Sequence, residues 1–99
     1  MQVIIHQSGS ISDGQREFIT EKLEKLQTFY DRIERAEVHF RTDDRKSETD
    51  AITVVARLAI PGNDVAAEST DASLEKAVAE VQEKLRRQLK KVKTKQSKF

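Results

Sequence analysis

The segment Ala51–Ile60, AITVVARLAI, decides the fold of this 99-residue chain. Every second residue of the segment is apolar, and the residues between them include Thr53 and Arg57. The apolar face consists of Ile52, Val54, Ala56, Leu58 and Ile60. Alternation with a period of two is typical of a strand that is buried on one face only. A sheet built from such strands is covered by helices on one side.

Segments before and after Ala51–Ile60 extend this pattern. Arg35–Thr42 alternates in the same way, and Met1–His6 is rich in β-branched residues, so both are predicted strands. Pro61–Asp64 is a predicted turn, because Pro presets φ and Gly and Asn tolerate positive φ. We expect a short strand at Val65–Ser69. The charged segment 43–50 contains no apolar residue and is expected to be a solvated loop.

Two further segments have the period of a helix. Ser12 is followed three residues later by Gln15, the spacing of a capping box, so a helix is predicted to begin near Asp13. Its apolar stripe contains Phe18, Ile19, Leu23, Leu26, Phe29 and Tyr30, with Ile33 just beyond. A second, longer helix begins at about Ser73, and its stripe contains Leu74, Ala77, Val78, Val81, Leu85, Leu89 and Val92.

The predicted order of elements is β-α-β-β-β-α. This order indicates an α+β fold in which a four-stranded sheet carries two helices packed side by side on one face. We expect a single domain over residues 1–95 and a short C-terminal tail over residues 96–99.

Charge is divided sharply along the chain. Residues 1–83 contain 10 Lys and Arg against 17 Asp and Glu, a net charge of −7. Residues 84–99 contain 8 Lys and Arg and no acid, a net charge of +8. The total of +1 hides this division. A cationic segment on an otherwise acidic domain predicts a polyanionic partner.

Basic residues cover nearly all of the polar circumference of the second helix after Glu83. They are Lys84, Arg86, Arg87, Lys90, Lys91, Lys93 and Lys95. Cations near a helix C-terminus interact favourably with the macrodipole, but only by about 0.3–1 kcal/mol each and only within the last turn. This many cations with no compensating acid among them indicate a ligand that neutralises their mutual repulsion.

The first helix offers a second set of charges. Arg16 and Lys25 lie at the two edges of its apolar stripe, and Lys22 lies within the stripe, where its stem must snorkel past the core. Glu17, Glu21 and Glu24 lie on the opposite side. Ordinary surface charge supported by i, i+4 pairs is the alternative explanation for this helix.

The kind of polyanion follows from which residues accompany the cations. No aromatic residue lies within the basic segment except the terminal Phe99, so base stacking is not predicted. Lys and Arg on a helix without aromatic neighbours suit the phosphate backbone and shape of folded RNA. A membrane surface is disfavoured because the sheet requires the apolar stripe. On charge alone, DNA is also a possible polyanionic partner.

Several classes of function have no support in the sequence. There is no cysteine for disulfide or thiolate chemistry, and three glycines form no phosphate-binding loop. His6 and His39, the only histidines, lie on separate predicted strands, so neither is predicted to hold a metal or to act in catalysis. No apolar run approaches the roughly 20 residues of a membrane span, and the N-terminus lacks a basic leader. We therefore expect a cytoplasmic protein that is not an enzyme and needs no cofactor or metal.

Three segments carry a resemblance to a known family: Arg16–Leu26 (REFITEKLEKL), Phe29–Ile33 (FYDRI) and Lys84–Lys95 (KLRRQLKKVKTK). They resemble the ribosome hibernation-promoting factor / ribosome-associated inhibitor A family, also labelled sigma-factor modulation proteins. The resemblance implies a double-stranded-RNA-binding-like fold. It also implies a stress and stationary-phase factor that binds the small ribosomal subunit through ribosomal RNA. Such a factor occludes the positions of messenger RNA and of A- and P-site transfer RNA.

The resemblance also implies which residues contact RNA. On matching positions these are Arg16, Lys22, Lys25, Lys84, Arg87, Lys91, Lys93 and Lys95, and Arg86 and Lys90 extend the same surface. Ser73–Ala79 lacks the Tyr and Asp that the family usually has at the start of the second helix. The chain also resembles the short form of the family, without the extra domain that pairs ribosomes, and a monomer is expected.

Two other functions stay open at the level of sequence. The basic helix could dock on an acidic protein, such as a polymerase subunit, or the domain could bind RNA generally with no preference for ribosomes. The steep salt dependence of phosphate binding would partly separate RNA from a protein partner.

Overall fold

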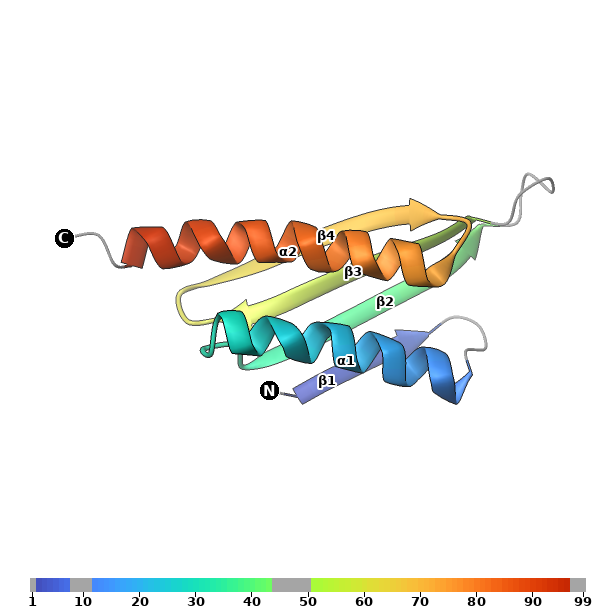
Figure 1. Cartoon of the computed structure of the whole chain (residues 1–99), viewed down its shortest axis with the longest axis horizontal. Coiled ribbons are helices and arrows are strands. Elements are labelled where there is room, and N and C mark those ends of the chain that lie inside the picture. The colour runs from blue at the N-terminus through green and yellow to red at the C-terminus, as the bar shows by residue number, and fades with distance from the viewer. Residues whose placement is uncertain (1, 8–11, 44–50, 97–99) are drawn as a thin grey trace.

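The computed structural model describes residues 2–7, 12–43 and 51–96. The strands and helices follow one another in the predicted order β-α-β-β-β-α (Figure 1). The elements are β1 (Gln2–Gln7), α1 (Asp13–Phe29), β2 (Arg35–Asp43), β3 (Ala51–Ile60), β4 (Asn63–Asp71) and α2 (Leu74–Gln96). Most of the expected loop at 43–50 and the last residues of the expected tail lie outside the described residues.

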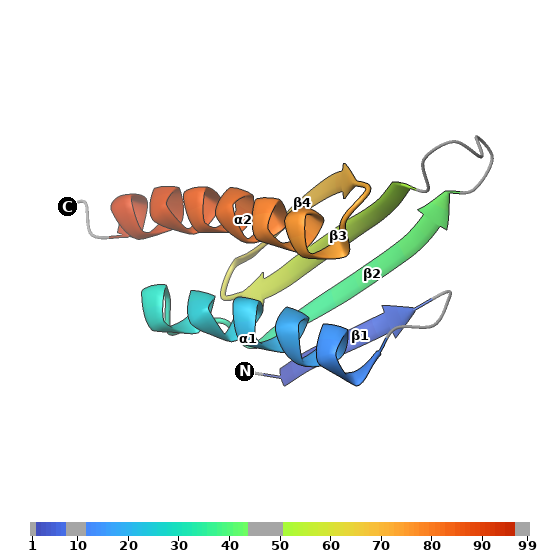
Figure 2. The same ribbon diagram turned by 45° about the vertical axis from the view of Figure 1, so that its right-hand side comes forward.

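The four strands form one sheet in the order β1-β2-β3-β4 (Figure 2). Strand β1 pairs with β2 in parallel, and the two following pairs are antiparallel. A parallel pair needs a crossover connection, which α1 supplies between β1 and β2. Strand β1 therefore lies at one edge of the sheet, and its residue His6 is in register with His39 of β2.

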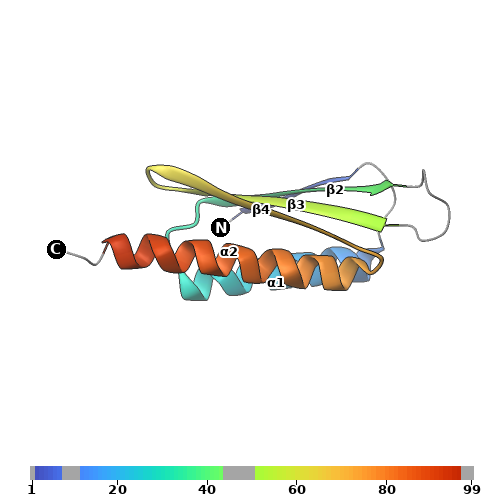
Figure 3. The ribbon, with the colours of Figure 1, turned by 90° about the horizontal axis from the view of Figure 1, so that it is seen from above.

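Both helices lie on the same face of the sheet, as predicted (Figure 3). They lie side by side and run in the same direction, because each begins at the same end of the sheet (Figure 1). Gln82 Nε2 of α2 donates a hydrogen bond of 2.7 Å to the backbone oxygen of Lys22 in α1. None of the described elements covers the opposite face of the sheet (Figure 3).

The core lies between the helices and the sheet and is built from the predicted stripes. Leu58 of β3 and Leu85 and Leu89 of α2 are 0% exposed. Helix α1 contributes Ile19 and Leu23, at 1% and 2% exposed. Burial of one stripe on each helix fixes the rotation of that helix and therefore which of its side chains face solvent.

The start of α1 has the predicted capping box. The Ser12 hydroxyl accepts a hydrogen bond of 3.1 Å from the Gln15 backbone N–H, and the Ser12 N–H donates to Gln15 Oε1 at 3.0 Å. Two backbone donors that the helix leaves without an internal partner are thus satisfied.

The predicted last strand at Val65–Ser69 is present, but its predicted limits were wrong, because β4 extends over Asn63–Asp71. The turn consists of Pro61 and Gly62 alone, with Gly62 at a φ of 85°, and Asn63 already pairs with Ile60. The residues by which β4 exceeds the prediction are all polar and lack the apolar signal: Asn63, Asp64, Thr70 and Asp71. Within the predicted part of the strand, Ser69 is buried facing α2, and its hydroxyl donates a hydrogen bond to Glu80.

Candidate nucleic-acid interface

The C-terminal half of α2 presents a continuous set of cations to solvent. Because Leu85 and Leu89 are fully buried against the sheet, the residues around them point outward. The exposed cations of this segment, which we call the α2 basic surface, are Lys84, Arg86, Arg87, Lys90, Lys91 and Lys93. Lys95 lies in the last turns of the same helix, but its side chain is outside the described part of the chain.

Two cations of α1 lie alongside this surface. The backbone oxygen of Lys22 accepts the hydrogen bond from Gln82, which lies just before the basic surface begins. The Lys22 ammonium lies 5.4 Å from the centre of the Phe18 ring. Lys22 is half-buried, as the predicted snorkelling requires, and Lys25 is exposed less than one turn further along. The structure thus brings both lysines to the level where the α2 basic surface starts.

Arg16 has a different position. It is exposed in the first turn of α1, nine residues before Lys25, which corresponds to about 13 Å along the helix axis. Since the two helices begin at the same end of the sheet (Figure 1), the first turn of α1, which contains Arg16, lies level with the start of α2 and not with its basic half. Of the predicted contact residues whose side chains the structure describes, all but Arg16 therefore form one group.

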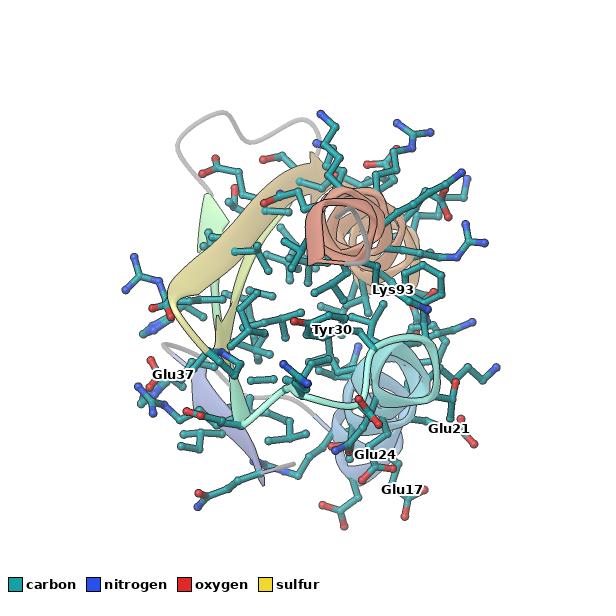
Figure 4. The ribbon with its side chains drawn as sticks, turned by 90° about the vertical axis from the view of Figure 1, so that its left-hand side faces the viewer. Glu17, Glu21, Glu24, Tyr30, Glu37 and Lys93 are labelled. Atoms are coloured by element: carbon teal, nitrogen blue, oxygen red, sulfur yellow. The ribbon has the colours of Figure 1, made fainter. Side chains whose placement is uncertain are left out.

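Acidic side chains occupy the outer side of α1. Glu17, Glu21 and Glu24 are exposed and point away from the sheet and from Lys93, which lies between the two helices (Figure 4). With Thr20 these glutamates line a shallow hollow of about 340 Å³. Their position agrees with the expected separation of acids from the basic residues of the same helix.

One acid does reach the basic surface, so the expectation of cations without a compensating acid needs correction. Glu83 Oε2 lies 3.7 Å from Arg86 Nη1 and 3.5 Å from Arg87 Nε. The side chain of Arg87 is nevertheless 72% exposed. Exposed pairs of this kind contribute little to stability, and one carboxylate shared by two guanidinium groups leaves an excess of positive charge.

The structure also places an aromatic ring under the cations, which the sequence did not predict. The half-buried ring of Phe29, at the end of α1, has Lys93 Nζ 4.6 Å and Arg86 Cζ 5.3 Å from its centre. Cations over an aromatic face are attracted by its quadrupole. No pattern within α2 could have indicated this contact, because it depends on how α1 and α2 pack.

Two lysines of the surface are anchored to backbone carbonyls. Lys93 Nζ donates to the Phe29 oxygen at 3.0 Å, and Lys84 Nζ donates to the Glu68 oxygen of β4 at 2.8 Å. The Lys93 contact satisfies a carbonyl at the C-terminal end of α1, where a cation is also favoured by the helix dipole. An ammonium group has three donors, so the hydrogen bond to Glu68 leaves Lys84 able to bind an anion as well.

A hollow of about 360 Å³ opens beside Lys93 at the end of α1. It is lined by Thr28, Phe29, Tyr30, Asp31, Arg32 and Lys93. Arg32 is exposed and adds a cation beside Lys93 that was not among the predicted contacts. In the sequence, Arg32 lies in the segment Phe29–Ile33, which carries the resemblance to the family, but it was not counted among the predicted RNA contacts.

Comparison with known proteins identifies the family. Residues 3–97 match the family described as Sigma 54 modulation protein / S30EA ribosomal protein. The chain belongs to this family. A search of curated protein sequences finds no match. Within the described residues, neither helix is long and apolar enough to cross a membrane.

Two solved structures share the fold of this Sigma 54 modulation / S30EA member. A ribosomal subunit interface protein from Coxiella burnetii is 25% identical, with a TM-score of 0.84 over 95% of this chain and 99% of that one. The N-terminal domain of Protein Y from Thermus thermophilus is 24% identical, with a TM-score of 0.76 over 93% of this chain and 99% of that one. The predicted family and the predicted β-α-β-β-β-α fold are both confirmed, and the family is one of ribosome-associated modulation proteins.

Proposed function

We propose that this protein binds the small ribosomal subunit through ribosomal RNA and silences translation by occupying the positions of messenger RNA and of A- and P-site transfer RNA. Membership of the S30EA family supports the ribosome as the partner. The observation that supports RNA as the bound component is the α2 basic surface, which places six exposed cations on one packed helix. Under this proposal the protein acts in the cytoplasm during stress or stationary phase.

The geometry favours phosphate contacts over reading of bases. Arg86 and Lys93 both lie over the Phe29 ring, so the ring orders cations and is not a free platform for a base. Lysine and arginine side chains held on a rigid helix suit the phosphates of folded RNA, which position a protein without specifying sequence. The shape of the domain and of its RNA site then determines where it binds.

The proposed mechanism is steric exclusion and includes no chemical step. The acidic side of α1, with Glu17, Glu21 and Glu24, would be repelled by phosphate, whereas the basic surface is attracted. This opposition orients the domain as it approaches. Once the basic surface is bound, the sheet and α1 fill space that messenger or transfer RNA would otherwise need.

Co-sedimentation with purified small subunits tests the proposal. At low salt we expect the wild type to travel with the subunits and the Arg87→Glu/Lys91→Glu variant to stay at the top of the gradient. Lys76→Glu is the matched control, because Lys76 is exposed on the same helix before the basic surface. A wild type that stays at the top, or a control that is lost equally, would contradict the proposal.

Competition experiments separate the remaining functions. Unrelated duplex RNA should displace the protein from subunits only at a large excess; equal competition would indicate a general RNA-binding domain. Initiator transfer RNA and messenger should compete with the protein for the subunit, since the proposed positions overlap. Simultaneous binding of all three would rule out occlusion while leaving ribosome binding intact.

A further inference from the structure

The open face of the sheet carries a cluster of metal-ligating side chains that the proposed RNA-binding function does not use. His6 of β1 is in register with His39 of β2, and their rings stack with centroids 4.4 Å apart and 9° between planes. Glu37 lies two residues before His39, on the same face of β2. One ligand atom from each of the three side chains lies within 4.8 Å of the others.

We propose that His6, Glu37 and His39 bind a divalent transition-metal ion of the kind that prefers imidazole ligands, such as Zn²⁺. Bonds from such an ion to nitrogen or carboxylate oxygen are about 2.0–2.2 Å, so ligand atoms around a tetrahedral ion are about 3.3 Å apart. The three side chains must therefore close by roughly 1.5 Å or less. Both histidines are exposed and Glu37 is half-buried, so rotation of the side chains can achieve this without a change in the sheet.

The strand pairing explains why these ligands meet. Residues in register on adjacent strands point to the same face of a sheet, with their Cβ atoms close together. His6 and His39 are far apart in the sequence and become neighbours only because β1 pairs in parallel with β2. Two imidazoles and one carboxylate leave one or more coordination positions open, which water would fill.

Neighbouring cations lower the affinity of the site for a metal ion. Arg35 Nε donates to Glu37 Oε2 at 3.0 Å, so one carboxylate oxygen is engaged and a positive charge stands beside the site. Arg57 of β3 is in register with Glu37 and adds a second positive charge on this face. Both arginines oppose the binding of a cation, and the proposed site is accordingly one of moderate affinity.

The site is separate from the proposed RNA interface, because the sheet lies between them. Glu37 and Lys93 are on opposite sides of the sheet in the view along the helices (Figure 4). A metal ion at His6 and His39 would join the edge strand β1 to β2 without covering the α2 basic surface. Failure of one proposal would therefore leave the other intact.

Calorimetric titration of the untagged protein with ZnCl₂ tests the site. We expect one Zn²⁺ per chain, and we expect either His6→Gln or His39→Gln to weaken binding by at least about tenfold. Glu21→Gln, which removes an exposed carboxylate from α1, should leave the affinity unchanged. Absence of saturable binding, or equal affinity of the wild type and both histidine variants, would overturn the proposal.

Two further measurements distinguish a specific metal site within one chain from non-specific metal binding. Arg35→Gln frees the Glu37 carboxylate and removes a repelling charge, so it should tighten Zn²⁺ binding roughly two- to fivefold. In NMR spectra, Ni²⁺ should broaden the resonances of both imidazoles together, and these are the only two histidines of the chain. Broadening of one imidazole alone, or a Zn²⁺-bridged dimer in sedimentation velocity, would contradict a site within one chain.

Discussion

Neutralising two outward cations of α2 should change the salt dependence of binding by a definite amount. Arg87 and Lys91 are exposed and lie one helical turn apart, on the side of α2 away from the core. The Arg87→Gln/Lys91→Gln variant therefore removes two charges without disturbing Leu85 or Leu89, which hold the helix on the sheet. Folding should be retained, and any loss of binding should come from charge.

The expected magnitude follows from counterion release. Each neutralised phosphate contributes about −0.9 to the log–log slope of affinity against salt on duplex DNA and about −0.7 on a single strand. If Arg87 and Lys91 each contact one phosphate, the variant's slope should be shallower by about 1.4–1.8. Between 50 and 200 mM salt, the advantage of the wild type over the variant should then shrink about 7- to 12-fold.

The measurement is the affinity for purified small subunits at several salt concentrations between these limits. Lys76→Gln serves as the control, because it removes an exposed lysine from the same helix outside the basic surface. The wild type and the control should give the same slope. Parallel lines for the wild type and the Arg87/Lys91 variant would refute phosphate contact by these two residues, whatever the loss of affinity at one salt concentration.

Further predictions concern stability and titration. Ser12→Ala removes the cap of α1 and should lower the free energy of unfolding by about 1 kcal/mol. Gly14→Ala should raise it by about 0.5–1 kcal/mol, because an added Cβ meets nothing closer than 3.9 Å. Leu85→Ala, at a fully buried position, should lower it by about 2–5 kcal/mol. Urea unfolding measures all three, and a change of the opposite sign would contradict the packing described. The hydrogen bond from Arg35 lowers the pKa of Glu37 below its usual 4.5, and the charge of Arg35 adds to the effect. The ionised Glu37 therefore contributes stability above about pH 4.5, which is lost as pH falls through the lowered pKa. NMR titration of the Glu37 carboxyl should show this pKa rising in Arg35→Gln; an unchanged value would contradict the cause given.

Much of the secondary structure could be predicted because its signals are local. The period of β3 and the capping box at Ser12 each lie within a few residues and were confirmed in place. The limits of β4 could not be predicted in this way. The four residues by which β4 exceeds the predicted strand are polar, and they are held in the strand by pairing with β3, which an apolar pattern does not report: Asn63, Asp64, Thr70 and Asp71.

The interface was predictable in part for the same reason. The six cations of the α2 basic surface follow from one helical period and one buried stripe, so a sequence that contains both places them on the surface. Their environment was not predictable. The direction in which α1 lies beside α2 decides that the Phe29 ring lies beneath Lys93. It also decides that the first turn of α1, with Arg16, lies beside the start of α2.

By itself, then, the sequence determined the order of elements, the buried stripe of each helix and the division of charge at Glu83. Only the tertiary structure decided which distant residues meet. The stacking of His6 on His39 requires the parallel pairing of β1 with β2, and the anchoring of Lys93 on Phe29 requires two helices that run in the same direction. Periodicity reports which face of an element is buried, because that depends on neighbours along the chain. It does not report which element lies alongside, because that depends on how all the buried faces pack together.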